Sequence, residues 1–156
     1  SKIMATTTAS ITLSSSDLLT DNLSLSATTT LYEHGTTATG VDECNYHRAN
    51  IPTGTQFDLI QDSAALSDKA NYVYIVNKNT DVTDYLIVSI RNKVIGRLYA
   101  GDWLFMPWSD NTTATAGTDD PSGDDSSISI RAYTHECAVE YALFHVGETL
   151  LTHTDS

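Results

Sequence analysis

Two pairs of potential metal ligands stand far apart in the chain. Cys44 and His47 form one pair, and His135 and Cys137 form the other. Two thiolates and two imidazoles together make a ligand set for structural zinc, although its ligands are usually separated by about two to four residues and His135 and Cys137 by only one. The sequence does not show that the two pairs meet. It leaves two interpretations open, a zinc site of four residues or two ordinary thiols with two histidines on the surface or in loops.

The same two cysteines could form one disulfide. A bridge between Cys44 and Cys137 would close a long loop and stabilise the fold by about 4 to 5 kcal/mol in the chain-entropy model. Residues 1–8 lack the apolar run of a signal peptide, and a chain made in a reducing compartment keeps its thiols reduced. We therefore expect two reduced thiols, with the disulfide as the alternative.

An acidic segment could hold a cation. Asp119, Asp120, Asp124 and Asp125 lie within seven residues of one another, and calcium prefers carboxylate oxygens. Their spacing differs from that of an EF-hand loop. A solvated acidic loop is the first interpretation, and a bound divalent ion is the alternative.

Recognisable catalytic motifs are missing from the sequence. The chain has no Gly-x-Ser-x-Gly elbow, no Gly-x-Gly-x-x-Gly turn and no P-loop. Trp103, Trp108 and the tyrosines could form a sugar platform, but aromatic side chains on strands more often pack in a core. Glutamates could act as the paired carboxylates of a glycoside hydrolase, but the sequence places none of them opposite a partner; they are Glu33, Glu43, Glu136, Glu140 and Glu148. We expect no enzymatic activity, no catalytic residue and no cofactor.

The elements that would position these residues are short strands. The apolar residues alternate with polar ones or form short β-branched and aromatic runs separated by turn residues. Residues 71–108 hold most of the bulky side chains and should form the core of the sheets. The pattern predicts eight to ten strands in an all-β, antiparallel β-sandwich with a jelly-roll-like topology. The expected strands cover 9–13, 23–28, a piece near 46–48, 56–60, 72–76, 85–90, 94–98, 103–106, 127–133 and 137–146.

Some connections carry specific expectations. Leu18 and Leu19 should plug an edge of the sandwich, and Pro107 should end its strand because proline cannot donate to a ladder. Residues 33–50 should form a long loop around the short strand piece. The segment 109–127 has almost no bulky residue, so it should be an exposed, mobile loop.

Length and charge restrict the class of protein. The 156 residues suit one domain, with an N-terminal arm over 1–8, a sandwich over 9–148 and a C-terminal tail over 149–156. The formal charge of -12 argues against nucleic-acid binding, which needs clustered Lys and Arg. No apolar run approaches the length of about 20 residues that spans a bilayer. We expect neither nucleic acid nor membrane as a partner.

One short segment resembles an enzyme-fold motif. The run Gly101-Asp102-Trp103-Leu104-Phe105-Met106-Pro107 is similar to the second cupin motif, in which a glycine turn, a buried strand and a proline precede a metal-binding histidine. Here Trp108-Ser109-Asp110 follows, and the paired histidines of the first cupin motif are absent. The resemblance implies a jelly-roll scaffold without the cupin metal site.

A longer stretch resembles a group of virion proteins. The order YVYIVN, YLIVSI, IGRLYAGDWLFMPW, SISIRAY and VEYALF over residues 71–144 is similar to small β-rich structural proteins of tailed bacteriophages, particularly those of marine and cyanobacterial phages. The resemblance implies a non-enzymatic capsid decoration, or cement, protein on the outer surface of the virion head. It would be made in the host cytoplasm, bind across joints of the major capsid protein and associate with itself, with a trimer favoured.

The ends of the chain are the expected contacts with the capsid. Ile3 and Met4 in the arm, and Leu150 and Leu151 in the tail, could each extend the edge of a neighbouring sheet; frayed termini are the alternative. Two other functions stay open. The protein could be a tail, fibre or head-tail joining component with exposed loops, or a jelly-roll lectin or enzyme.

Overall fold

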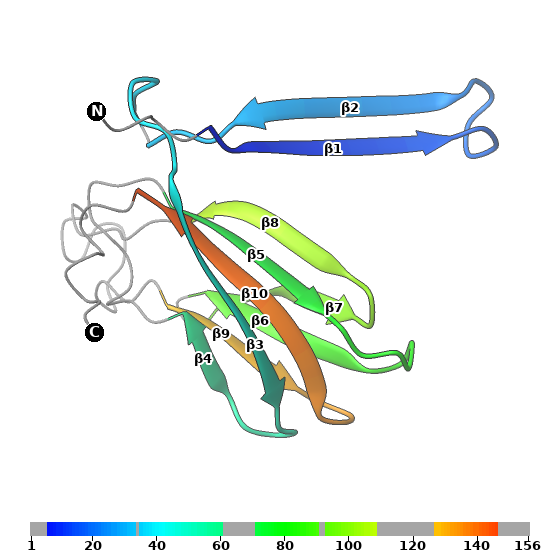
Figure 1. Ribbon diagram of the computed structural model, residues 1–156. Coiled ribbons are helices and arrows are strands. Elements are labelled where there is room, and N and C mark those ends of the chain that lie inside the picture. Colours follow the sequence, from blue (N-terminus) through cyan, green and yellow to red (C-terminus); the bar gives the residue numbers. More distant parts are fainter. Residues whose placement is uncertain (1–5, 34, 61–70, 91–92, 109–126, 147–156) are drawn as a thin grey trace.

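The computed structural model describes residues 6–33, 35–60, 71–90, 93–108 and 127–146. Within these ranges the chain is built from strands and turns, and the all-β prediction is confirmed. Figure 1 shows the ten strands. They are β1 (Thr8–Ser15), β2 (Leu23–Thr30), β3 (Glu43–Ile51), β4 (Phe57–Ile60), β5 (Asn71–Asn77), β6 (Tyr85–Ile90), β7 (Lys93–Tyr99), β8 (Trp103–Trp108), β9 (Ile128–Ala132) and β10 (Cys137–His145).

Eight of these strands form a sandwich of two antiparallel sheets. One sheet has the order β3-β10-β5-β8 and the other the order β4-β9-β6-β7. The chain crosses from one sheet to the other at every connection from β3 to β10 except the one between β6 and β7, which pair directly. This order is that of a jelly roll. The predicted sandwich and its topology are therefore confirmed.

The core lies between the sheets, where alternate residues of facing strands meet. Val73 and Ile75 of β5, Leu86 of β6, and Ile128 and Ile130 of β9 are each at most 1% exposed. Burying a side chain of this size stabilises a fold by roughly 1.5 to 3 kcal/mol. The central strands of each sheet thus supply most of the core. The predicted core segment 71–108 supplies only part of it, because the central strands β9 and β10 lie outside that range.

Strand β3 is longer than predicted. It pairs with β10 over its whole length, from Glu43 opposite His145 to Ile51 opposite Cys137. The sequence of β3 is mostly polar, and only Ile51 is fully buried. This segment becomes a strand because it hydrogen-bonds to the apolar strand β10, and not because of its own sequence pattern. The prediction of a long loop over 33–50 is therefore wrong beyond residue 42.

Strand β8 does not end at Pro107, so the prediction for this residue is wrong. Pro107 lies inside the strand, opposite Tyr72 of β5, and the strand continues to Trp108. Because β8 is an edge strand of its sheet, one of its two sides has no ladder, and a missing N–H on that side costs no hydrogen bond. The turn before β8 is as expected, with Gly101 at a φ of 88°, a conformation that glycine adopts without strain.

The first two strands stand outside the sandwich. β1 and β2 pair only with each other, as a two-stranded sheet, and Figure 1 shows this hairpin above β8 and extending past the end of the sandwich. The predicted domain over 9–148 therefore contains two parts, a hairpin and a sandwich that begins at β3. Residues 1–5 of the predicted arm, the predicted tail and residues 109–126 of the predicted loop lie outside the described residues.

Candidate functional site

The hairpin has one apolar face and one hydroxyl-rich face. The antiparallel register places Ile11 opposite Ala27, and Leu13 opposite Leu25, on one face. The other face carries only serine and threonine from both strands: Thr8, Ser10, Thr12, Ser14, Ser24, Ser26, Thr28 and Thr30. Neither strand contains a charged residue.

The apolar face of the hairpin is not buried. Ile11 is 42% exposed, Leu13 is 49% exposed and Leu25 is 54% exposed. An isolated two-stranded hairpin is at best marginally stable in water, and an exposed apolar patch marks an interaction surface. The alternation that predicts a half-buried strand is therefore real, but the sandwich of the same chain does not cover it.

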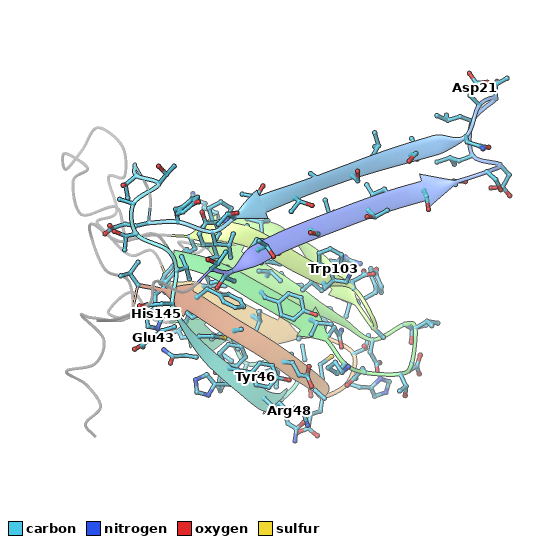
Figure 2. The ribbon with its side chains drawn as sticks, turned by 45° about the horizontal axis from the view of Figure 1, so that its top comes forward. Asp21, Glu43, Tyr46, Arg48, Trp103 and His145 are labelled. Atoms are coloured by element: carbon cyan, nitrogen blue, oxygen red, sulfur yellow. The ribbon has the colours of Figure 1, made fainter. Side chains whose placement is uncertain are left out.

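The tip of the hairpin corrects another expectation. Leu18 and Leu19, predicted to plug the sandwich edge, are 68% and 56% exposed in the turn between β1 and β2. The side chain of Ser15 organises this turn, since its Oγ accepts hydrogen bonds from the backbone N–H groups of Asp17 and Leu18 at 3.3 and 3.1 Å. Figure 2 places Asp21, also in the turn, at the far end of the hairpin from the sandwich. The leucines reach no core because the turn lies far from one.

The base of the hairpin is fixed to the sandwich by a compact set of hydrogen bonds. The N–H of Leu31 donates to the carbonyl of Thr7 at 2.8 Å, and the N–H of Val41 donates to the carbonyl of Leu31 at 3.1 Å. Thr7 Oγ1 donates to the carbonyl of Val41 at 3.0 Å. Leu31 and Val41 are 2% and 1% exposed, and the N–H of Asp42 donates to the carbonyl of His145 in β10 at 3.2 Å. The direction of the hairpin is thus set by buried contacts at its root.

Beneath the hairpin, the outer face of the β3-β10-β5-β8 sheet is aromatic. The rings of Tyr72 and Phe105 stack with centroids 5.7 Å apart, and Phe105 meets Phe144 edge-on at 6.3 Å. Tyr74 lies opposite Phe105 in the register of β5 and β8. Trp103, at the start of β8, is 51% exposed and lies below the hairpin in Figure 2.

An open groove of about 620 Å³ separates the hairpin from this aromatic face. Its upper wall comes from the root half of the hairpin, and its floor comes from β5 and β8. The lining residues are Ala9, Ser10, Ile11, Ala27, Thr29, Leu31, Tyr72, Tyr74, Trp103, Phe105 and Pro107. None of these side chains is charged, and their polar groups are hydroxyls and the indole N–H of Trp103. The groove ends at Ile11 and Ala27, so the outer half of the hairpin lies beyond it.

The predicted zinc ligands do not come together. Cys44 lies opposite Phe144, and Cys137 lies opposite Ile51 at the other end of the β3–β10 pair, about 23 Å away at roughly 3.3 Å per residue. Both cysteines are free thiols, and His47 packs its ring on Tyr141 at 5.3 Å. Within the described ranges no group of three or more Cys, His, Asp or Glu side chains could hold a metal ion. Burial raises the pKa of both thiols.

His135 takes part in a polar cluster at the end of the sandwich. Its Nδ1 lies 2.7 Å from Oδ1 of Asp84, whose other oxygen accepts a hydrogen bond from Nδ2 of Asn79 at 2.9 Å. The hydrogen bond to Asp84 raises the pKa of His135, and the same bond is the main cause of the lowered pKa of Asp84. Asn79 also accepts from the N–H of Ala138 at 2.8 Å. These bonds join the β5–β6 connection to the β9–β10 connection and to the start of β10, so the cluster is structural.

The carboxylates give no facing pair among the described residues. Glu140 forms an ion pair with Arg48 at 2.9 Å on the outer face of the sheet. Glu43 lies 3.7 Å from Nε2 of the buried His145, five residues along the register from Glu140. Glu33 and Glu136 lie in connections, and Glu148 is outside the described ranges, as are the predicted contact residues Ile3, Met4, Leu150 and Leu151 and the acidic segment 119–125.

Comparison with family models, with curated proteins and with solved structures finds no match to this chain. In the described part of the chain, no helix is long and apolar enough to cross a membrane. The hairpin and the groove are therefore the features of this chain that bear on its function. The sequence pattern did predict both hairpin strands, but it held no signal for where their apolar face would point.

Proposed function

We propose that this chain is a non-enzymatic structural protein of a virion, a capsid decoration protein that binds the outside of a tailed-phage head. The observation that carries the proposal is the hairpin, a pair of uncharged strands whose exposed leucines lie beyond the end of the sandwich. A rigid sandwich that offers such an element is suited to contact other protein chains in an assembly. The resemblance of residues 71–144 to small phage structural proteins gives the assembly its identity.

The charge of the chain supports an outward position on the head. A formal charge of -12 would be repelled by packaged DNA, whose phosphates bind clustered cations. Decoration also needs no active site, because a subunit that binds two or more neighbouring capsid proteins stabilises the shell by multivalent contact alone. In this proposal Ile3, Met4, Leu150 and Leu151 bind the major capsid protein.

A second candidate function rests on the aromatic floor of the groove. Trp103, Tyr74 and Phe105 offer ring faces of the kind on which sugars stack, and jelly rolls also occur as lectins. The side chains that line the groove, however, supply only hydroxyls and the indole N–H of Trp103, and no carboxylate, amide or guanidinium to orient a sugar. Sugar binding would show as a shift of Trp103 fluorescence on adding oligosaccharides, with Trp103→Ala as the control.

The test of the proposed function is uptake by heads. Purified protein is added to heads that lack it, and bound copies and resistance of the heads to heat are measured. We expect hundreds of copies per head and greater resistance, and reduced uptake when Leu150 and Leu151 are both replaced by Asp. Absence of uptake would refute the proposal. Labelling of intact particles at the tail alone, with a dozen copies or fewer, would replace it with the tail or joining role.

A further inference from the structure

We propose that the exposed aromatic floor of the groove is covered by the outer half of the hairpin from a second copy of this chain. The outer half is the part beyond Ile11 and Ala27, with Leu13, Leu25 and the tip turn. The inference deepens the proposed function and rests on it, since it names the contact by which decorating copies hold one another. It concerns only the described residues of the hairpin, β5 and β8.

Each copy has two apolar surfaces with no cover of their own. The outer half of the hairpin carries Leu13 and Leu25, which are about half exposed, and Figure 1 shows that this half extends past the sandwich. The floor of the groove carries Trp103, which is also half exposed. Each copy has one hairpin and one groove floor, so copies of this chain can cover each other's floors with their hairpins and leave neither surface over.

Charge also favours a second copy. Two chains that each carry a formal charge of -12 repel each other, and the repulsion is weaker when they meet on surfaces free of charge, because their charges then stay farther apart. The hairpin strands contain no charged residue, and neither does the lining of the groove. The strands of the hairpin and the groove therefore meet without like charges, and the acidic residues of the outer half, Asp17 and Asp21, lie in its tip turn.

The size of the contact predicts how the copies associate. The outer half and its turn are roughly 20 Å long and about 10 Å wide at the spacing of residues and strands in a sheet. A contact of this size buries on the order of 400 Å² in total, which is below the range of about 1,200 to 2,000 Å² for a specific complex. One contact alone is therefore weak. A closed assembly of three copies, in which every copy gives a hairpin and receives one, makes three such contacts and holds each copy at two places.

The test uses paired variants of the purified full chain, whose association is measured by sedimentation velocity across micromolar concentrations. Leu13→Asp with Leu25→Asp places two charges on the apolar face of the hairpin. Thr12→Asp with Ser26→Asp places the same charges on the opposite face, one residue away in each strand. On the floor, Trp103→Asp is matched by Tyr46→Asp on β3, since both side chains are 51% exposed and Tyr46 does not line the groove.

We expect the leucine pair and Trp103→Asp to be monomers, and both controls to associate like the unchanged chain. One variant retains its floor and the other its hairpin, so a mixture of the two can form only single contacts and should associate more weakly than the unchanged chain. The thermal melting of all variants should stay close to that of the unchanged chain, since none of these side chains belongs to the core. Circular dichroism checks that each variant is folded.

Three results would overturn the proposal. The unchanged chain could stay a monomer across the whole range, which would assign these surfaces to a different protein. Trp103→Asp could associate normally while the leucine pair does not, which would place hairpin against hairpin. The mixture could associate as strongly as the unchanged chain, which would show that the floor and the hairpin do not contact each other. All of these measurements use the chain alone, so uptake by heads tests the proposed function separately, and uptake of a monomeric protein would keep that function and remove this contact.

Discussion

Two tryptophans in one strand give a sharp test of which surface folds the protein and which one associates. Trp103 and Trp108 both belong to β8. Trp103 is 51% exposed on the floor of the groove, whereas Trp108 is 5% exposed in the core cluster. Replacing each by Ala removes the same side chain from opposite faces of one strand, so any difference arises from what that face contacts.

The two replacements should act on different equilibria. Trp108→Ala leaves a cavity in the core and should lower the free energy of unfolding by about 3 to 5 kcal/mol, which corresponds to a fall of about 6 to 20 °C in melting temperature for a chain of this size. Trp103→Ala should cost about 1 kcal/mol or less. It removes about 100 Å² of aromatic surface, half of a tryptophan side chain, that a second copy could bury. At about 25 cal/mol per Å² this is about 2.5 kcal/mol per contact.

Calorimetry and sedimentation then read the two effects independently. A loss of about 2.5 kcal/mol weakens a contact roughly 60-fold, so Trp103→Ala should shift association to much higher protein concentration while it melts almost as the unchanged chain does. Trp108→Ala should melt early, and the folded fraction should still associate. The reasoning fails if Trp103→Ala melts as early as Trp108→Ala, or if it associates with unchanged affinity.

The remaining predictions concern the sandwich. Because the pKa of His135 is raised, its bond to Asp84 stabilises the fold fully at pH values below the ordinary pKa of histidine, and this stabilisation is lost as pH rises through the raised pKa. Because the pKa of Asp84 is lowered, the stabilisation from the same bond is also lost as pH falls through that lowered pKa. The melting temperature of the unchanged chain should therefore exceed that of His135→Gln most between about pH 5 and 6, and an equal gap at pH 9 would contradict the assignment. Asn77→Ala should lower the free energy of unfolding, measured by urea titration, by about 2 to 4 kcal/mol. Asn77 is fully buried, and its side chain donates to the carbonyl of Leu98 at 3.0 Å and accepts from the N–H of Asn79 at 3.0 Å. The comparison is Asn79→Ala, which changes a more exposed residue. In the native protein a maleimide should label Cys44 and leave Cys137 unlabelled, since Cys44 is exposed and Cys137 is buried, and rapid labelling of both thiols would show that the β9–β10 end opens.

The strands that carry the core were predictable because their own residues specify them. β5 and β6 are mostly β-branched and aromatic, and their bounds match the expected 72–76 and 85–90 to within a residue. β3 was not predictable to the same extent, because its polar sequence becomes a strand only by hydrogen bonding to β10. The place of Pro107 inside a strand was not predictable for a related reason. An edge strand can hold a proline, and only the strand order shows that β8 is an edge strand.

The candidate site was predictable only in its parts. Alternation predicts two strands with an apolar face at 9–13 and 23–28, and the hairpin confirms them. A period of two residues, however, is the same whether the apolar face packs on the sandwich of its own chain or on another chain, so the pattern cannot report that Leu13 and Leu25 are exposed. Cys44 and His135 illustrate the converse case, in which residue types suggested a site that the register of β3 and β10 keeps apart.

The buried root of the hairpin has a consequence for the rate at which copies meet. Because Leu31, Val41 and Thr7 hold the hairpin to the sandwich, its orientation is already set in the free chain. An arm that is ordered before it binds loses little conformational entropy on contact. It also forgoes the longer capture radius of a disordered segment. Association should therefore proceed at the rate of about 10⁵ to 10⁷ M⁻¹s⁻¹ that is usual for docking two preformed patches, and added salt should increase that rate by screening the repulsion between acidic copies.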